Sequence, residues 1–355
     1  MTADAALAAV QATPALSPPR RVLILTDAWA PQVNGVVRTL ETLGRDLAAM
    51  GHDVQYATPE GRFTLPLPTY GEIRLAVFPR RSLERMIESF RPDAVHIATE
   101  GTIGLSARAI CLRRKIPFTT SFHTRFPEYV NARFPFVPKA LVYRFLRWFH
   151  GPASAMMVAT PSLKLELESH GFHNVRIWSR GVDINLFRPI EEVRSPYEKP
   201  IWLYVGRVAV EKNIEAFLSL NLPGTKIVIG EGPARARLER AWPSVRFLGP
   251  KTGEDLVRHY AGSDVFVFPS RTDTFGLVIL EALACGVPVA AYPVQGPRDV
   301  VGDAPVAALE HDLEAACRRA LAIPRQACRT FALTRSWRAC TDQFLSNLPA
   351  APRRD

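Results

Sequence analysis

The feature that most constrains the fold is an alternation of short aliphatic, β-branched runs with longer amphipathic stretches, and it occurs twice along the chain. The first run, RVLILT at residues 21–26, is followed after a loop by residues 35–50, where apolar side chains recur at helical spacing. The pattern restarts with IWLYV at residues 201–205, after a polar, proline-containing segment at 188–200. This alternation is typical of parallel α/β units, so we predict two α/β domains joined by that segment.

Other short apolar runs extend the same pattern through both halves. We predict further strands at 54–58, 73–78, 94–97, 118–121 and 156–159 in the first half, and at 226–229, 245–248, 265–268 and 287–290 in the second. The predicted bounds are a tail at 1–20, an N-terminal domain at 21–190 and a C-terminal domain at 191–335. The tail is rich in Ala and Pro and lacks the basic start and continuous apolar run of a signal peptide, so we expect it to be disordered.

Composition limits the possible partners. The chain of 355 residues is long enough for two cores of ordinary size, and its formal net charge of +10 predicts an anionic partner. The five cysteines are scattered without a CxxC pair, which favours reduced thiols in a cytoplasmic protein over a zinc site or a disulfide framework. No apolar stretch approaches the ~18 residues that a membrane span needs, so any membrane contact is expected at the surface.

The strongest candidate site follows the predicted strand at 265–268. The segment SRTDTFGLVILE at 270–281 is a polar loop, with Asp273 and Gly276, that leads into a predicted helix. Free N–H groups at a helix N-terminus suit a phosphate, and the carboxylate of Glu281 can accept the two hydroxyls of a ribose. The structural alternative makes Asp273 a helix cap and Glu281 a solvated residue. The apolar neighbours of Glu281 favour the functional interpretation.

A second candidate loop, GRVAVEKN at 206–213, directly follows the predicted strand at 201–205. Its glycine lets the backbone turn sharply where the strand ends. Arg207 and Lys212 would then place two cations at the mouth of the sheet, where positive charge stabilises a departing pyrophosphate. An ordinary surface loop is the alternative, and the first motif makes it the weaker one.

Three weaker candidates also follow predicted strands. Gly35 opens a helix after Asn34, so it would let a phosphate or sugar approach the backbone; the segment is not a GxGxxG fingerprint, which argues against NAD. His123, in SFHTR, lies on a strand-end loop of the kind that faces ligands in α/β folds, although a buried structural histidine is the alternative. Glu231 ends another strand and remains a candidate without an assigned role.

Positive charge is concentrated between Arg108 and Trp148, where nine Lys and Arg residues stand against the single acid Glu128. This window therefore carries +8 of the net charge of +10. Nothing in the chain resembles a nucleic-acid-binding module, so we expect no nucleic-acid partner.

Within this basic window, VPKALVYRFLRWFH at 137–150 is predicted to be a helix. At 100° per residue its aliphatic and most of its aromatic residues fall on one half, and its basic residues, together with Tyr143, fall on the other. Such a helix suits an anionic lipid surface, although Leu141 and Phe145 could instead pack into the domain and leave the arginines solvated. The residues predicted to contact the membrane are Lys139, Arg144, Arg147 and Trp148.

Together these motifs resemble glycosyltransferase family 4, over about residues 21–301 and at 336–344. The loop at 206–213 resembles the phosphate-binding G-R…E-K-N of the family. Asp273 and Glu281 resemble its E-x7-E motif, with Asp replacing the first Glu, and TDTFG resembles bacterial α-mannosyl-, sulfoquinovosyl- and diacylglycerol glycosyltransferases. The resemblance implies an α/β GT-B fold, with two Rossmann-like domains facing each other across a cleft and a closing helix at 336–348 that returns to the N-terminal domain.

The resemblance also implies roles for individual residues. Arg207 and Lys212 would neutralise the donor diphosphate, while Asp273 and His123 would lie at the transferred sugar. The expected donor-binding residues are Gly35, Gly206, Lys251, Phe275, Gly276, Leu277 and Glu281, with the ribose on Glu281 and the base near 249–251. The family retains the anomeric configuration by front-face attack, with the departing phosphate as base, so no protein nucleophile is expected. No metal-binding D-x-D motif is required, none appears, and no cofactor beyond the donor substrate is expected.

The predicted function is therefore a retaining, metal-independent hexosyltransferase. It would carry a sugar from a nucleotide-sugar donor, with a UDP-sugar favoured, to a lipid such as diacylglycerol at the inner face of the cytoplasmic membrane. A soluble acceptor and a GDP-mannose-dependent α-mannosyltransferase acting on a lipid or polyprenyl precursor remain open. From other classes, the missing GxGxxG argues against an NAD-dependent oxidoreductase, and the retained Arg207, Lys212 and Glu281 argue against a non-catalytic nucleotide-binding protein.

Overall fold

The computed structural model describes residues 18–30, 35–67, 70–123, 138–193, 195–273 and 275–350. Most of the predicted tail at 1–20 therefore lies outside the described residues. The chain folds into two compact units. Of the described residues, the N-terminal unit contains 18–179 and 340–350, and the C-terminal unit contains 180–339.

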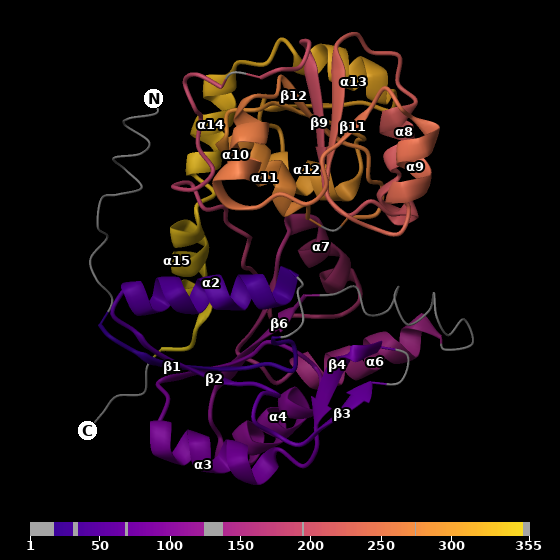
Figure 1. The fold of residues 1–355 in the computed structure, drawn as a ribbon. Helices are drawn as coiled ribbons and strands as arrows, with labels where there is room; N and C mark the ends of the chain where they lie inside the picture. The colour runs from indigo at the N-terminus through magenta and orange to yellow at the C-terminus, as the bar shows by residue number, and fades with distance from the viewer. Residues whose placement is uncertain are drawn as a thin grey trace. The chain divides into compact units, whose positions relative to one another are not determined.

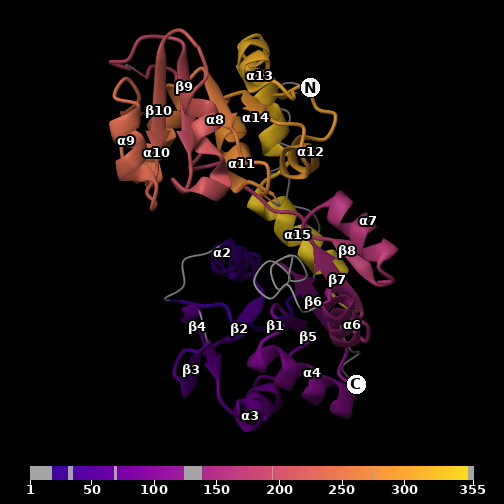
Figure 2. The same ribbon diagram turned by 90° about the vertical axis from the view of Figure 1, so that its right-hand side faces the viewer.

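The N-terminal unit is built on a six-stranded parallel sheet with the order β2-β1-β5-β6-β7-β8. Strands β1, β5 and β7 are mostly apolar and buried because helices cover both faces of a parallel sheet, with α3 and α4 on one face and α2 on the other (Figures 1 and 2). The strands are β1 (Arg21–Leu25), β2 (Asp53–Ala57), β5 (Ala94–Ile97), β6 (Phe118–Phe122), β7 (Ala155–Val158) and β8 (Val175–Ile177). The helices are α2 (Gly35–Ala49), α3 (Arg80–Phe90), α4 (Thr102–Arg114), α6 (Lys139–His150) and α7 (Pro161–Ser169).

One predicted strand has a different partner from the others. The run predicted at 73–78 overlaps β4 (Tyr70–Ala76), which pairs antiparallel with β3 (Thr64–Leu67) in a separate two-stranded sheet. The remaining predicted strands of the first half match β2, β5, β6 and β7 to within one residue at each end.

The C-terminal unit repeats the plan, with a parallel sheet in the order β11-β10-β9-β12-β13-β14. The strands are β9 (Ile201–Val205), β10 (Thr225–Ile229), β11 (Arg246–Phe247), β12 (Val265–Phe268), β13 (Val289–Ala291) and β14 (Ala307–Leu309). The helices are α8 (Ile214–Leu218), α9 (Arg235–Ala241), α10 (Gly253–Ala261), α11 (Leu277–Ala284), α12 (Gln295–Val301), α13 (Leu313–Ala320) and α14 (Arg325–Leu333). Alternate residues of β9 enter two different cores, one with α10, α11 and α14 and one with α8, α9 and α13.

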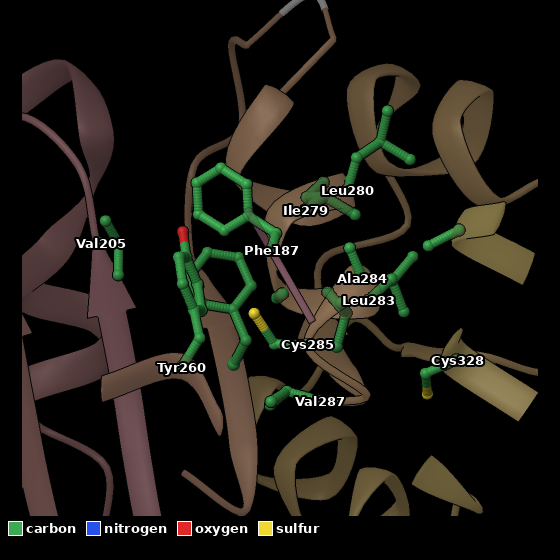
Figure 3. Packing of buried hydrophobic residues seen from close by; sticks show 14 of the residues in the cluster. Phe187, Val205, Tyr260, Ile279, Leu280, Leu283, Ala284, Cys285, Val287 and Cys328 are labelled. Atoms are coloured by element: carbon green, nitrogen blue, oxygen red, sulfur yellow. The ribbon is translucent and has the colours of Figure 1, made fainter. Parts of the chain in front are cut away.

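The boundary between the units lies earlier than the predicted position after residue 190. Val182, Ile184 and Phe187 belong to the core of the C-terminal unit, and the Phe187 ring packs at 6.0 Å from that of Tyr260 (Figure 3). The segment is therefore part of this core, and the polar stretch at 188–200 lies inside the C-terminal unit instead of joining two domains. The sequence pattern marks polarity, whereas the boundary follows these apolar contacts.

The partly buried guanidinium of Arg329 on α14 holds the same segment in place. It donates hydrogen bonds to the carbonyls of Ile184, Phe187 and Ala284, at 3.0, 2.8 and 2.9 Å. Burial lowers the pKa of Arg329 from its usual value.

The closing helix is α15 (Trp337–Asn347), and from Cys340 onward it belongs to the N-terminal unit, as the resemblance implied. The Asn347 side chain donates to the Ile177 carbonyl at 2.8 Å, and Gln343 Oε1 accepts from the Ser179 N–H at 2.7 Å. Phe344 is fully buried against Trp178. Within the described part of the chain, no helix has both the length and the apolar character that crossing a bilayer needs.

Candidate active site

The two strongest sequence motifs meet at one edge of the C-terminal sheet. Their strands, β9 and β12, are neighbours, so the loops at their carboxyl ends emerge side by side. There the ammonium group of Lys212 forms a hydrogen-bonded ion pair with Asp273 Oδ1. The side chains of Lys212 and Asp273 are 27% and 22% exposed, so this pair is partly shielded from solvent. The structure thus joins a predicted phosphate-binding cation to a predicted sugar-binding carboxylate.

Two further hydrogen bonds tie these loops together. The Asn213 side-chain amide donates to the Pro269 carbonyl at 3.0 Å. Thr272 Oγ1 donates to the Glu211 carbonyl at 3.3 Å. Asn213 has a φ of 52°, in the left-handed region that Asn tolerates better than most residues. These contacts position Lys212, which lies between Glu211 and Asn213.

Arg207 has a different environment from Lys212. Its guanidinium lies 3.8 Å from Glu211, and both side chains are well exposed, at 65% and 55%, so this pair holds Arg207 weakly. The neighbouring Tyr204 hydroxyl is buried and donates to the Arg207 carbonyl at 2.8 Å. Burial raises the pKa of Tyr204, and the charges of Asp273 and Glu211 raise it further. The loop backbone is therefore better anchored than the Arg207 side chain.

The N-terminus of α11 offers backbone donors beside this ion pair. The helix begins at Leu277, and its N-cap residue is Gly276, whose φ is 83°. Among the described residues, no side chain at the N-cap accepts a hydrogen bond from the first turn. Asp273 pairs with Lys212, so the structure does not support its alternative role as a helix cap. Phe275, Gly276 and Leu277 are all partly buried at this end of the helix. An uncapped helix N-terminus with an adjacent cation suits a phosphate group.

Glu281 lies within α11 and is buried, with 7% of its surface exposed, so the solvated alternative is wrong. Its Oε2 accepts a hydrogen bond from the fully buried Tyr260 hydroxyl at 3.1 Å. Tyr260 comes from α10 and gave no signal in the sequence. The contact orients the carboxylate that is expected to hold the ribose.

Close backbone packing holds the loops of the site in place. The sequence indicated only some of the glycines that this packing needs. A Cβ on Gly230 would lie 1.9 Å from the Gly206 carbonyl oxygen. The turns after β9 and β10 therefore pack so closely that residue 230 must be glycine. A Cβ on Gly296 of α12 would lie 2.4 Å from the Asp273 carbonyl oxygen. Gly296 was missed because its role depends on a neighbour that is distant in sequence.

The remaining predicted residues of the C-terminal unit occupy more exposed positions. Lys251 Nζ lies 3.0 Å from Asp255 Oδ2, and that contact lowers the pKa of Asp255. The carbonyl of Gly249 accepts from the Gly230 N–H at 2.9 Å, which joins the loop at 249–251 to the glycine turns. Glu231 pairs with Arg235 at 2.6 Å, and the hydrogen bond lowers the pKa of this exposed carboxyl group.

Gly35 and His123 belong to the N-terminal unit. Gly35 is the first residue of α2, and a Cβ placed on it would meet nothing within 4 Å, so the space beside it is open. His123 directly follows β6, is partly buried, and its ring packs edge-on against that of Trp178 at 5.9 Å.

The predicted membrane helix is α6, and the structure changes which residues face outward. Tyr143, assigned to the basic face, is buried, whereas Leu141, Phe145 and Trp148 are 55%, 38% and 53% exposed. The packing of Leu141 and Phe145 into the domain is therefore wrong. Residues that share one outer surface are Lys139, Ala140, Leu141, Arg144, Phe145, Arg147 and Trp148. Basic and aromatic side chains thus lie together on the exposed side instead of on opposite faces.

Contacts beneath this surface hold two of its members. The Arg108 guanidinium lies 3.9 Å from the centre of the Trp148 ring, and its Nη2 donates to the Trp148 carbonyl at 2.6 Å. Arg147 donates to the His170 carbonyl at 2.9 Å. The five cysteines are all buried and free, and the described residues contain no group of three or more His, Cys, Asp or Glu side chains that could hold a metal ion.

Two family models match the chain in succession. One is described as Glycosyltransferase Family 4 and covers residues 33–186; the other is described as Glycosyl transferases group 1 and covers residues 199–323.

Curated relatives cover most of the chain. A GDP-mannose-dependent alpha-mannosyltransferase of Mycobacterium tuberculosis is 31% identical, over 93% of this chain and 96% of that protein. Sulfoquinovosyl transferase SQD2 of Arabidopsis thaliana is also 31% identical, over 81% of this chain and 62% of its own length. An alpha-monoglucosyldiacylglycerol synthase of Streptococcus pneumoniae is 27% identical, over 85% of this chain and 78% of that protein.

Solved structures match in fold. Sucrose-phosphate synthase from Thermosynechococcus elongatus gives a TM-score of 0.69 at 21% identity, over 92% of this chain and 98% of that one. WaaG, a glycosyltransferase involved in lipopolysaccharide biosynthesis, gives 0.60 at 17% identity, over 91% and 98%.

Proposed function

This chain belongs to glycosyltransferase family 4 and has a GT-B fold of two Rossmann-like units, and on that premise we propose that it transfers a hexose from a nucleoside-diphosphate donor to a hydroxyl group of a membrane lipid, with retention of configuration. The observation that carries the proposal is the partly buried ion pair of Lys212 and Asp273 beside the uncapped N-terminus of α11. One cation, one carboxylate and a row of backbone donors match what a diphosphate with an attached sugar requires.

The geometry assigns a task to each group. The Lys212 ammonium and the N–H groups at the start of α11 would stabilise the charge that develops on the diphosphate as its bond to the sugar breaks. Asp273 would accept hydrogen bonds from sugar hydroxyls, and Glu281, oriented by Tyr260, would accept those of the ribose. His123 would act at the sugar from the N-terminal unit. Arg207 would contribute charge from a more exposed position.

Retention of configuration is supported by the products that two relatives are named for. The Mycobacterium tuberculosis relative is named an alpha-mannosyltransferase, and the Streptococcus pneumoniae relative an alpha-monoglucosyldiacylglycerol synthase. The common nucleotide donors of mannose and glucose are α-linked, so an α-linked product corresponds to retention. The departing phosphate would take the proton of the acceptor hydroxyl on the same face of the sugar.

Two donor classes remain candidates. A UDP-sugar is the donor that the sequence favours. GDP-mannose has support from the name of a relative that matches over 96% of its length. Incubating the protein with UDP-glucose or GDP-mannose and diacylglycerol in phosphatidylglycerol vesicles should give a glycolipid with one donor, detected by mass spectrometry, and its anomeric proton should show the α configuration by NMR. Lack of a product with either donor, or a β-linked product, would contradict the corresponding part of the proposal.

Variants test the donor site directly. Lys212→Ala should abolish transfer while the protein stays folded by circular dichroism, because it removes the partly buried cation of the site. Lys199→Ala is the matched control, since the Lys199 side chain pairs with Asp264 in the same unit and is itself 67% exposed. Turnover of Lys212→Ala at the wild-type rate would refute the assignment.

A lipid acceptor is supported by the names of the relatives and by the outer surface of α6. That surface combines aromatic side chains with Lys139, Arg144 and Arg147, a mixture suited to the headgroup region of an anionic membrane. Replacing Arg144 and Arg147 by Ser should weaken flotation with vesicles of phosphatidylglycerol and phosphatidylcholine. The double variant of Arg237 and Arg240 on α9 removes the same charge from the other unit and should float like the wild type. Equal flotation of both variants would refute the proposal that α6 contacts the membrane.

A further inference from the structure

A carboxylate that carries no sequence motif shares a sheet edge with His123. β5 and β6 pair in parallel, and their last partners are Ile97 and Thr120. Glu100 and His123 each lie three residues beyond that pair, although β5 ends at Ile97 and β6 continues beside β7 to Phe122. The carboxyl ends of adjacent parallel strands form one ligand-facing edge. Glu100 therefore lies at the same edge as the residue expected at the transferred sugar.

A buried histidine orients this carboxylate. His150, at the end of α6, is fully buried, and its Nε2 lies 3.2 Å from Glu100 Oε1. Its Nδ1 lies 2.9 Å from the Thr120 hydroxyl on β6. An ionised carboxylate only accepts hydrogen bonds, so Nε2 carries the proton, and in the neutral ring Nδ1 accepts from Thr120. The chain from Thr120 through His150 fixes where Glu100 Oε1 lies.

The opposite end of the carboxylate is available. The Glu100 side chain is 14% exposed, and among the described residues its only hydrogen bond is the one to His150. Asp27, at the end of the neighbouring strand β1, provides the contrast. It is buried and accepts hydrogen bonds from the N–H groups of Ile103 and Gly104, at 2.9 and 3.3 Å, so it caps the start of α4. Among the described residues, one carboxylate of this edge is fully used by the fold and the other keeps an oxygen without a hydrogen bond.

We infer that Glu100, held by His150, accepts a hydrogen bond from the reacting hydroxyl group of the acceptor. A carboxylate accepts strongly from a hydroxyl and repels a phosphate, so the acceptor at this edge presents a neutral hydroxyl group, such as that of a glycerol or a sugar, and not a polyprenyl phosphate. The inference rests on the proposed function, because it places the acceptor beside His123. It assigns the acceptor class, which the donor site does not determine.

The decisive variant is Glu100→Gln, which keeps an oxygen to accept from His150 and loses the charge. With dioctanoylglycerol as acceptor, kcat/KM should fall about 10- to 100-fold, the range expected for a lost hydrogen bond to a charged group. Affinity for UDP or GDP should stay unchanged, because that site lies in the other unit. Circular dichroism should show that the variant is folded. Glu88→Gln is the control, since it removes the same charge from α3, where the Glu88 side chain is 56% exposed and pairs with Arg114.

Calorimetry of dioctanoylglycerol binding separates this inference from the proposed function. If the wild type binds dioctanoylglycerol, Glu100→Gln binds it more weakly, and no sugar is transferred, the assignment of Glu100 stands and the proposed reaction fails. Thr120→Val should weaken the same binding to a smaller extent, because it acts through His150. Wild-type binding and kcat/KM in Glu100→Gln would overturn the inference, as would a wild type that accepts undecaprenyl phosphate and not dioctanoylglycerol.

Discussion

Replacing Asp273 by Asn should make the protein bind free UDP or GDP more tightly while transfer of the sugar falls. In the structure Lys212 is paired with Asp273. A donor diphosphate must compete for that ammonium group, whereas in the Asn variant the full charge of Lys212 is available to it. The same change weakens the acceptor that sugar hydroxyls would use, so affinity for the nucleotide and catalysis should move in opposite directions.

The magnitude follows from the environment of the pair. Two unit charges about 4 Å apart attract by about 4 kcal/mol at an effective dielectric constant of 20 and by about 1 kcal/mol in water. The two side chains are 27% and 22% exposed, which places the pair between these limits but nearer to a screened surface pair. Releasing about 1–2 kcal/mol would tighten nucleotide binding about 5- to 30-fold.

Isothermal titration calorimetry with UDP and GDP measures this change, and repeating it at high salt should reduce the difference between variant and wild type. Glu254→Gln is the control, because it removes one negative charge from an exposed pair with Arg188 in the same unit. Unchanged or weaker nucleotide binding in Asp273→Asn would refute the idea that Asp273 competes with the diphosphate for Lys212.

Three other predictions follow from packing and burial. Gly296→Ala should lower kcat by about 10- to 100-fold, because its Cβ would lie 2.4 Å from the Asp273 carbonyl oxygen and displace that loop; wild-type kcat would refute the steric role. Trp178→Ala should lower the free energy of unfolding in urea denaturation by about 3–5 kcal/mol, because Trp178 is fully buried. It should also lower kcat, because the Trp178 ring packs against His123, and Trp178→Phe should restore most of the stability and of kcat. Burial raises the pKa of four thiols from 9.0 to about 12, so their stabilisation is complete below pH 9 and is lost as the pH rises toward 12. Urea denaturation should therefore show a free energy of unfolding that falls above pH 9, by at most about 1.4 kcal/mol per pH unit for each thiol, and a flat profile would contradict this. These thiols are Cys111, Cys285, Cys317 and Cys328.

The sequence alone determined the strands and the donor motifs, because both are local. The bounds of β9, β12 and β5 agree with the predicted 201–205, 265–268 and 94–97, since strands buried on both faces are usually apolar runs. The glycine loop and the polar loop before α11 could be recognised because each follows its strand directly in the chain.

Tertiary structure decided everything that depends on residues distant in sequence. Lys212 and Asp273 are 61 residues apart, and only the adjacency of β9 and β12 makes them an ion pair. Helical periodicity could not tell which half of α6 faces the core, so the burial of Tyr143 and the exposure of Leu141 came from the structure. Glu100 and His150 belong to no sequence motif. They are 50 residues apart and come into contact only when β5, β6 and α6 pack together. Side-chain pairing across elements is a property of the packed fold, whereas periodicity reports only that a face will be buried.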